Sequence, residues 1–335
     1  MRRTILAAAV AASLAAGGAE AGAAGGGPGT DVGRIGIEPA GGGDRWVTLP
    51  IQGETVLARL DRNGRGVLWH RPLRGFHAIT GVSLDGTPTG LSADGGTLVL
   101  QRGSSSRPRR SLFTVVDARR MRVTGAIRLR GNFTLDAVSP DGRLVYFIEY
   151  TSRTDVTRYN VRVYDRRRGR LRPEPIVDRY EPDEVMRGLA LTRATSADGR
   201  WEYTLYSGTG KHPEPFVHAL DTVRAQARCI DLHGVEAVTD PGTMRLRLDA
   251  GGRELAVLRT NEPVAVVDTR SFEVHAPGHA DGAAAPAGPR PRRQGLDGGS
   301  PWPAAAVAGI VALLAAGALR VRGRRPRRPG ASQTP

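Results

Sequence analysis

The sequence predicts an all-β, β-propeller-like fold of about five four-stranded blades, followed by one C-terminal transmembrane helix. Two recurring sequence marks predict the blades: a short glycine-containing turn before an apolar stretch, and an aspartate at the end of an alternating stretch. Both marks recur about every 50 residues, a period typical of repeat architectures. An uncharged segment directly before an arginine cluster near the end of the chain predicts the helix.

The first 21 residues have the pattern of a signal peptide. Two arginines follow the first methionine, an apolar run comes next, and Ala19-Glu20-Ala21 has small residues at the two positions that precede a cleavage site. We therefore assign residues 1–21 to a signal peptide, with cleavage near Gly22. Residues 22–32 consist mostly of glycine and alanine and are expected to be disordered. An uncleaved N-terminal anchor is the alternative.

The glycine-containing turn recurs five times over residues 33–276, the predicted β-propeller domain. In the third copy, Pro140 fixes φ, the side chain of Asp141 can accept a hydrogen bond from the backbone two residues on, and Gly142 supplies a positive φ. A turn of this kind reverses the chain between two antiparallel strands. The matching glycines are Gly43, Gly95, Gly142, Gly199 and Gly252, at spacings of 52, 47, 57 and 53 residues.

The second mark is an alternating apolar strand that ends on an aspartate. We expect each of these aspartates to begin a turn to the next strand, a more common role for a repeated aspartate than acid–base chemistry. They are Asp61, Asp117, Asp165, Asp221 and Asp268, at spacings of 56, 48, 56 and 47 residues. Because the two marks keep the same period and phase, each repeat predicts four antiparallel strands, which is the sheet unit of a propeller blade.

These turns and strands resemble the repeat of YVTN-type and related WD-repeat-like β-propellers over residues 33–276. The resemblance implies a ring of blades, and proteins of this group include ligand-binding scaffolds, surface proteins and some enzymes. The chain departs from the pattern by showing fewer copies than is usual. A five-bladed ring, a larger ring with unrecognised blades and a pair of packed β-sheets therefore all stay open.

A tether and a membrane span are predicted after the repeats. Residues 277–301 are rich in proline, glycine and alanine and cannot bury a core, which is typical of a linker. Residues 302–319 carry no charge, and a helix of that length covers about 27 Å, close to the hydrocarbon thickness of a bilayer. Residues 320–335 contain six arginines and are predicted to be a cytoplasmic tail, which places residues 22–300 outside the cytoplasmic membrane. A buried alanine-rich helix is the alternative.

The formal net charge is +15, yet outside the C-terminal tail the arginines are mixed with acidic residues, and Lys211 is the only lysine. A scattered basic charge does not indicate a nucleic-acid-binding surface. The partners expected from the sequence are the membrane, through the single C-terminal span, and a protein, peptide or glycan ligand, with no nucleic acid.

No catalytic signature is present in the sequence. It lacks a G-x-S-x-G elbow, a P-loop and a C-x-x-C pair. His275, His279 and Asp281 have the spacing of metal ligands, but they lie at the start of the linker without a rigid element to orient them. We therefore predict a binding or scaffold module with no catalytic, cofactor-binding or metal residues.

Two other functions stay open. The first is a lactonase-like hydrolase that uses a metal or acidic residues at the centre of the ring, with Asp136, Glu149 or His212 as candidate residues. The second is a sensor whose short arginine-rich tail contacts a partner inside the cell or the lipid headgroups.

Overall fold

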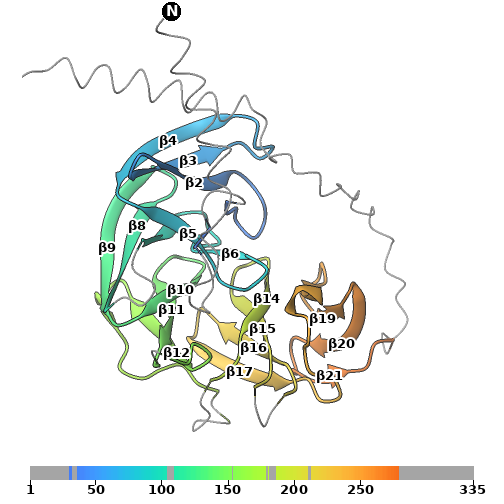
Figure 1. Cartoon of the computed structure of the whole chain (residues 1–335). Helices are drawn as coiled ribbons and strands as arrows, with labels where there is room; N and C mark the ends of the chain where they lie inside the picture. The colour runs from blue at the N-terminus through green and yellow to red at the C-terminus, as the bar shows by residue number, and fades with distance from the viewer. Residues whose placement is uncertain are drawn as a thin grey trace, which may run out of the picture.

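The computed structural model describes residues 30–31, 36–103, 109–152, 154–178, 180, 186–209 and 213–278. This part of the chain is all-β, with 21 strands and one 3₁₀ turn, Pro241–Thr243. The strands form five antiparallel sheets that follow one another in chain order around an arc (Figure 1). The sequence-based prediction of an all-β chain is therefore confirmed for these residues.

The third, fourth and fifth sheets are four-stranded meanders, as the repeats predict. The third sheet contains β10 (Phe133–Val138), β11 (Leu144–Tyr150), β12 (Tyr159–Asp165) and β13 (Arg170–Leu171). The fourth contains β14 (Ala190–Thr195), β15 (Trp201–Tyr206), β16 (Phe216–Asp221) and β17 (Gln226–Asp231). The fifth contains β18 (Met244–Leu248), β19 (Glu254–Arg259), β20 (Glu262–Asp268) and β21 (Val274–His275).

The first two sheets have the same strand order as the other three, with small departures. The first contains β2 (Arg45–Ile51), β3 (Glu54–Leu60) and β4 (Val67–Arg74). A single bridge between Ile37 and Trp46 stands where its innermost strand would lie. The second contains β5 (His77–Gly81), β7 (Thr97–Arg102), β8 (Arg110–Asp117) and β9 (Arg122–Arg130), with β1 (Thr30–Asp31) and β6 (Pro88–Thr89) paired to β5.

The predicted glycine turn joins the first and second strands of a sheet. In the third sheet the hydroxyl of Ser139 donates to Asp141 Oδ1 at 2.7 Å and accepts from the Leu144 N–H at 2.9 Å. Gly142 has a φ of 68°, which favours glycine. A Cβ on Gly142 would lie inside contact distance of Thr97, in the second sheet. The turn therefore reverses the chain and also packs against the preceding sheet.

The repeated aspartates begin the turns between the third and fourth strands, as the spacing predicts. Asp165 accepts hydrogen bonds from the backbone N–H groups of Arg167 and Arg168 at 2.9 and 3.2 Å. Asp221 accepts from the N–H groups of Val223 and Arg224 at 3.0 Å each. These carboxylates satisfy turn donors that no strand partner reaches.

The core lies between neighbouring sheets. Phe113 of the second sheet and Phe147 of the third are fully buried, with ring centroids 4.6 Å apart. Tyr203 of the fourth sheet and Val257 of the fifth belong to one buried cluster. Each four-stranded sheet between two neighbours is therefore apolar on both faces, which explains why its central strands are almost continuously hydrophobic.

Several predicted segments lie outside the described residues. These are the signal peptide (1–21), the membrane span (302–319), the cytoplasmic tail (320–335) and all but the first two residues of the linker. Within residues 22–32, expected to be disordered, Thr30–Asp31 form β1. In the part of the chain that is described, no helix has the length and apolar character needed to cross a bilayer.

Candidate functional site

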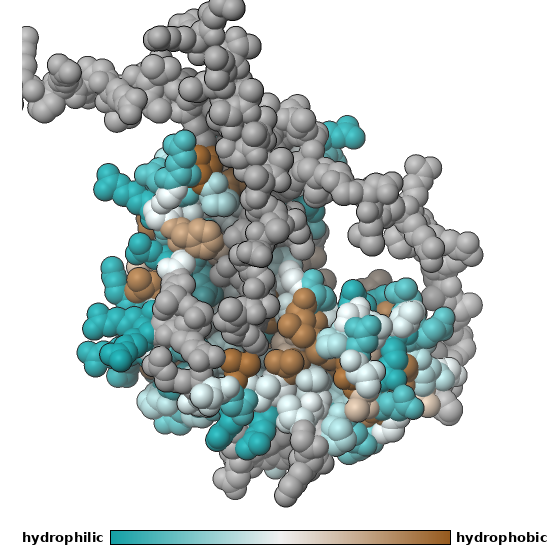
Figure 2. All heavy atoms as spheres, viewed as in Figure 1, coloured by the Kyte–Doolittle hydropathy of each residue, from teal (hydrophilic) through white to brown (hydrophobic). Residues whose placement is uncertain are grey.

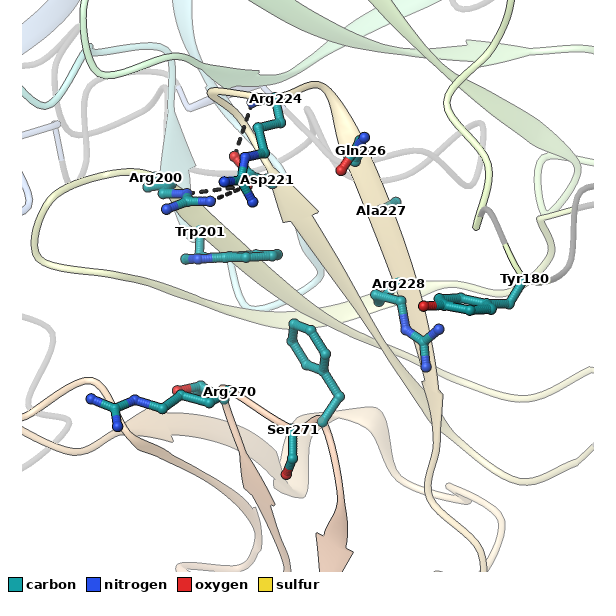
Figure 3. A pocket seen from close by; sticks show the side chains of 12 residues that line it. Tyr180, Arg200, Trp201, Asp221, Arg224, Gln226, Ala227, Arg228, Arg270 and Ser271 are labelled. Atoms are coloured by element: carbon teal, nitrogen blue, oxygen red, sulfur yellow. Dashed lines mark hydrogen bonds and ion pairs between the residues drawn. The ribbon is translucent and has the colours of Figure 1, made fainter.

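A groove of about 790 Å³ lies between the fourth and fifth sheets (Figure 3). The β16–β17 turn and β17 form one wall, and the β20–β21 turn forms the other. Four arginines and three aromatic residues line it, together with a single acidic residue: Arg200, Arg224, Arg228, Arg270, Tyr180, Trp201, Phe272 and Asp221. The groove therefore combines positive charge with aromatic surface.

Arg224 and Arg270 are placed by the repeated aspartate turns. The N–H of Arg224 donates to Asp221 at 3.0 Å, and the N–H of Arg270 donates to Asp268 at 2.8 Å. Both side chains are exposed, and neither guanidinium has a hydrogen-bond or ion-pair partner among the described residues. These bonds fix the backbone of both residues on the two walls of the groove. Arg224 points toward Arg200 and Trp201, whereas the Arg270 side chain extends outward at the rim, away from Arg228 (Figure 3). Both guanidinium groups can bind an anion that enters the groove.

Arg200 has a different role, because its charge is already paired. Its guanidinium donates to the buried carboxylate of Asp221 at 2.6 and 3.1 Å and lies 5.5 Å from the centroid of the Trp201 ring. The hydrogen bond to Asp221 raises the pKa of Arg200 above its usual value. This pair fixes the position of Trp201, which forms an aromatic wall of the groove.

Arg228 and Tyr180 form one end of the groove. The guanidinium carbon of Arg228 lies 4.2 Å from the centroid of the Tyr180 ring, a stacked cation–π contact. Arg228 Nε also lies 3.8 Å from the buried Asp178 carboxylate. Tyr180 is 61% exposed, so part of its surface is available to a ligand.

The charge of the groove favours anions. Among the described residues its lining contains four arginines and one aspartate, which leaves +3. The aspartate is paired with Arg200, and no histidine or cysteine is among the described lining residues. Such a lining can bind an anionic group and stack on a flat or apolar one, but it holds no pair of groups suited to acid–base or nucleophilic chemistry.

A second polar site lies where the innermost strands meet. Arg193 of β14 is 3% exposed and pairs with Asp136 of β10 through a short Nη2–Oδ1 contact. Its Nη1 donates to the Asp136 carbonyl at 2.5 Å, and its Nε donates to Thr204 at 2.8 Å. Glu202 accepts from the Thr195 hydroxyl at 2.6 Å and lies 4.0 Å from Arg193. Arg193 and Glu202 line a cavity of about 310 Å³.

Burial changes the titration of two groups in this region. It raises the pKa of Glu202 to about 7, against the opposing effect of Arg193. It lowers the pKa of His218 to about 4. At neutral pH His218 is therefore uncharged, and Glu202 is close to its titration midpoint.

The structure separates the candidate residues of the hydrolase hypothesis. Asp136 lies at the predicted centre, but its carboxylate is bound to Arg193. Glu149 does not lie there: it is on β11, the second strand of its sheet, and pairs with Arg162 at 2.6 Å toward the outer edge. His212 lies outside the described residues.

The metal-ligand spacing at the start of the linker receives no structural support. His275 is exposed at the end of β21, whereas His279 and Asp281 lie outside the described residues. The described part of the chain contains no group of three or more residues that could hold a metal ion.

Sequence reasoning missed the groove and Arg193. A signal existed for the groove, since Arg224 and Arg270 follow the repeated aspartates of two consecutive repeats by three and two residues. For Arg193 the signal was a charged residue within the apolar stretch that forms an innermost strand.

No family model and no curated protein matches the chain. Solved structures that it resembles include Kuenenia stuttgartiensis hydrazine synthase, at 15% identity and a TM-score of 0.45, over 78% of this chain and 68% of that one. Two others are the Myceliophteria thermophila Cps50 (Swd1) β-propeller domain, at 11% identity and a TM-score of 0.40, and TolB from Acinetobacter baumannii, at 12% identity and a TM-score of 0.39. Each of these two matches covers 71% of this chain and less than two thirds of the other, 64% and 52%.

These likenesses concern the fold and not the activity. The antiparallel four-stranded meanders, which follow one another in chain order, are the sheet unit of a propeller. The architecture is all-β and propeller-like.

Proposed function

We propose that this protein is a membrane-anchored, extracytoplasmic binding module that holds an anionic ligand of the cell envelope or its surroundings in the groove between the fourth and fifth sheets. The observation that carries this proposal is that Arg224 and Arg270 line the two walls of the groove and that neither guanidinium has a hydrogen-bond or ion-pair partner among the described residues. Each guanidinium group can form charge-assisted hydrogen bonds to a carboxylate or phosphate, and these bonds offset the entropy that the exposed side chains lose on binding.

The location rests on the two ends of the chain. The signal-peptide pattern of residues 1–21 and the arginine-rich tail of residues 320–335 indicate the same orientation, with the repeats outside the cytoplasmic membrane. An uncharged stretch at residues 302–319 is long enough to span the hydrocarbon core.

The size and surface of the groove indicate the class of ligand. A volume of about 790 Å³ accommodates a short stretch of a glycan or peptide. Trp201 already stacks on Tyr203 and has Arg200 over its ring, and Arg228 lies over the Tyr180 ring. The rest of the exposed Tyr180 ring offers a flat surface on which a sugar ring or another planar group can stack. We favour an acidic glycan over a peptide, because flat aromatic surface together with free arginines suits rings that carry carboxylates or phosphates.

Isothermal titration of the full-length protein in detergent tests this proposal. The probe is trigalacturonate, and its methyl ester is the matched neutral control. We expect binding of the acid only, with an affinity at least about tenfold lower in R224Q/R270Q, because charge-assisted hydrogen bonds are lost. The matched control R167Q/R168Q changes two exposed arginines in the equivalent turn of the third sheet. Equal affinities for the acid and the ester, or unchanged binding in R224Q/R270Q, would contradict the proposal.

The hydrolase remains the second candidate, and one observation favours it: Glu202 lines the central cavity with a pKa near neutrality. Melting temperatures measured with divalent metals test the metal-dependent form. A rise of several degrees that a chelator reverses would favour the enzyme. No rise, together with saturable binding to a cell-envelope fraction, would favour the binding module.

A further inference from the structure

The last strands of the first two sheets, β4 and β9, carry an unusual concentration of positive charge. Together they contain five arginines and no acidic residue: Arg71, Arg74, Arg122, Arg128 and Arg130. By contrast, β17 carries one arginine and one aspartate, and β13 and β21 are only two residues long. The charge is therefore a feature of this part of the perimeter and not of every outer edge.

These two strands follow one another along the outside of the arc and approach each other at one end (Figure 1). Arg71 of β4 donates to the carbonyl of Met121, the residue before β9, at 3.3 Å. The guanidinium groups of Arg74, Arg122, Arg128 and Arg130 have no partner among the described residues. Hydrophilic side chains are visible along this side of the surface in Figure 2. We call β4 and β9 together the basic edge.

The arrangement of charge on the basic edge is unfavourable without an anion. Arg110 and Arg130 are direct partners in the register between β8 and β9, so two like charges face each other across neighbouring strands. Such pairs are destabilising. No described acidic side chain forms an ion pair with either arginine. A surface that supplies negative charge would relieve this repulsion.

Exposed apolar side chains lie within the same strands. Leu68 and Trp69 on β4 are 51% and 55% exposed, and Val123 on β9 is 39% exposed. Arginine next to tryptophan and aliphatic side chains is the composition of surfaces that rest at a lipid–water interface. An acidic glycan could stack on Trp69, but the aliphatic Leu68 and Val123 offer it no flat face, whereas a bilayer interface accommodates all three side chains.

We propose that the basic edge lies against an anionic lipid bilayer, with the arginines at the headgroups and Trp69 and Leu68 in the interfacial layer. This contact does not depend on the groove. Where the C-terminal span proposed above holds the chain, the linker (277–301) starts beside β21, across the arc from the basic edge (Figure 1). Its 25 residues span at most about 85 Å when fully extended, which lets the edge turn toward the membrane that anchors it.

Tryptophan quenching by brominated lipids tests this contact. The full-length protein is placed in nanodiscs of brominated phosphatidylglycerol or brominated phosphatidylcholine. The difference between wild type and W69F isolates the Trp69 signal from the other three tryptophans. We expect Trp69 to be quenched at least twice as strongly in the anionic discs as in the neutral ones, with a loss of the difference at high salt.

Two triple variants provide the comparison. R122Q/R128Q/R130Q should abolish the excess quenching, whereas R167Q/R168Q/R170Q, which removes three exposed arginines at the edge of the third sheet, should retain it. Equal melting temperatures would show that all variants fold. R224Q/R270Q should also retain the quenching, which separates this contact from the groove. Equal quenching in both lipids, or an anionic excess that R122Q/R128Q/R130Q retains, would overturn the proposal. If quenching is equal and polygalacturonate binds wild type but not R122Q/R128Q/R130Q, the partner of the basic edge is an acidic polymer.

Discussion

Arg193 and Asp136 form a buried ion pair that joins the innermost strands of two neighbouring sheets. They are 57 residues apart in the chain, and their side chains are 3% and 2% exposed. Arg193 also donates to the Asp136 carbonyl at 2.5 Å and to Thr204 at 2.8 Å. The pair therefore ties the third sheet to the fourth at the centre of the arc.

Removing one partner of this pair should be costly. We expect R193A to lower the free energy of unfolding by about 3–5 kcal/mol, because Asp136 is left buried and unpaired. D136A should cost less than R193A but more than a surface pair, because Glu202 stays 4.0 Å from Arg193. The double variant D136L/R193M should recover much of that loss. Urea denaturation gives the free energy of unfolding of all three variants. E149A is the control: its partly exposed pair with Arg162 should cost about 1 kcal/mol or less. Equal losses in D136A and E149A would contradict this account.

Glu202 should make stability fall as the pH rises. Its pKa is 4.5 in the unfolded chain and about 7 in the folded protein, so the folded state binds the proton more tightly. The resulting stabilisation is complete below about pH 4.5 and is lost as the pH rises to about 7, a change on the order of 3 kcal/mol. E202Q keeps a neutral side chain at every pH. We expect the unfolding free energy of E202Q, relative to wild type, to increase across this window.

The groups that face Glu202 determine how this experiment is interpreted. Arg193 lies 4.0 Å from it and lowers its pKa, whereas Asp136 raises it. His218 is affected in the opposite sense, since burial lowers its pKa to about 4 and its contribution is lost as the pH falls. Comparing E202Q with wild type at each pH removes the contribution of His218. A difference that does not change between pH 4.5 and pH 8 would show that Glu202 is charged in the folded state.

Alanine substitutions in two glycine turns allow the cost of backbone strain to be measured apart from the cost of a packing clash. Gly142 and Gly252 have φ values of 68° and 66°, so an alanine at either position costs about 1–2 kcal/mol of backbone strain. A Cβ on Gly142 would also collide with Thr97, which Arg166 holds by a hydrogen bond of 3.2 Å, whereas a Cβ on Gly252 would meet nothing within 4 Å. Because the backbone strain is common to both variants, we expect urea denaturation to show G142A less stable than G252A by about 1–3 kcal/mol, the cost of the clash. Equal losses would mean that the turn does not pack on the second sheet.

Tyr180 should affect ligand binding without affecting stability. Its ring is 61% exposed and stacks on Arg228 at 4.2 Å. Y180A should leave the melting temperature within about 1 °C of wild type, because exposed side chains contribute little to folding. It should weaken the binding of trigalacturonate about 3- to 10-fold through loss of the stacking surface. V223A, which truncates another exposed side chain near the β16–β17 turn, is the control. A fall in melting temperature without loss of affinity would contradict the role of Tyr180 in the groove.

The repeat pattern was predictable from the sequence because its chemistry is local. Ser139, Asp141 and Gly142 form their turn through hydrogen bonds and dihedral angles within a few residues, and Asp165 caps the next turn in the same way. Alternating apolar residues between these turns require strands with two buried faces. The all-β class and the four-stranded sheets follow from these short-range rules.

Contacts between repeats could not be deduced in the same way. Asp136 and Glu149 are acidic residues of two neighbouring strands, yet Asp136 pairs with Arg193 of the next sheet and Glu149 pairs with Arg162 of its own sheet. Periodicity places a residue on a strand, but it does not show which charged side chain of a neighbouring sheet comes within reach.

The sequence by itself determined the repeat period, the turn chemistry and the all-β class, since each depends on neighbours along the chain. Only the tertiary structure brought Arg224 and Arg270 to one groove and joined Arg193 to Asp136. Those pairings depend on how two twisted sheets pack face to face, and side chains about 50 residues apart meet only once the interfaces between the sheets have formed.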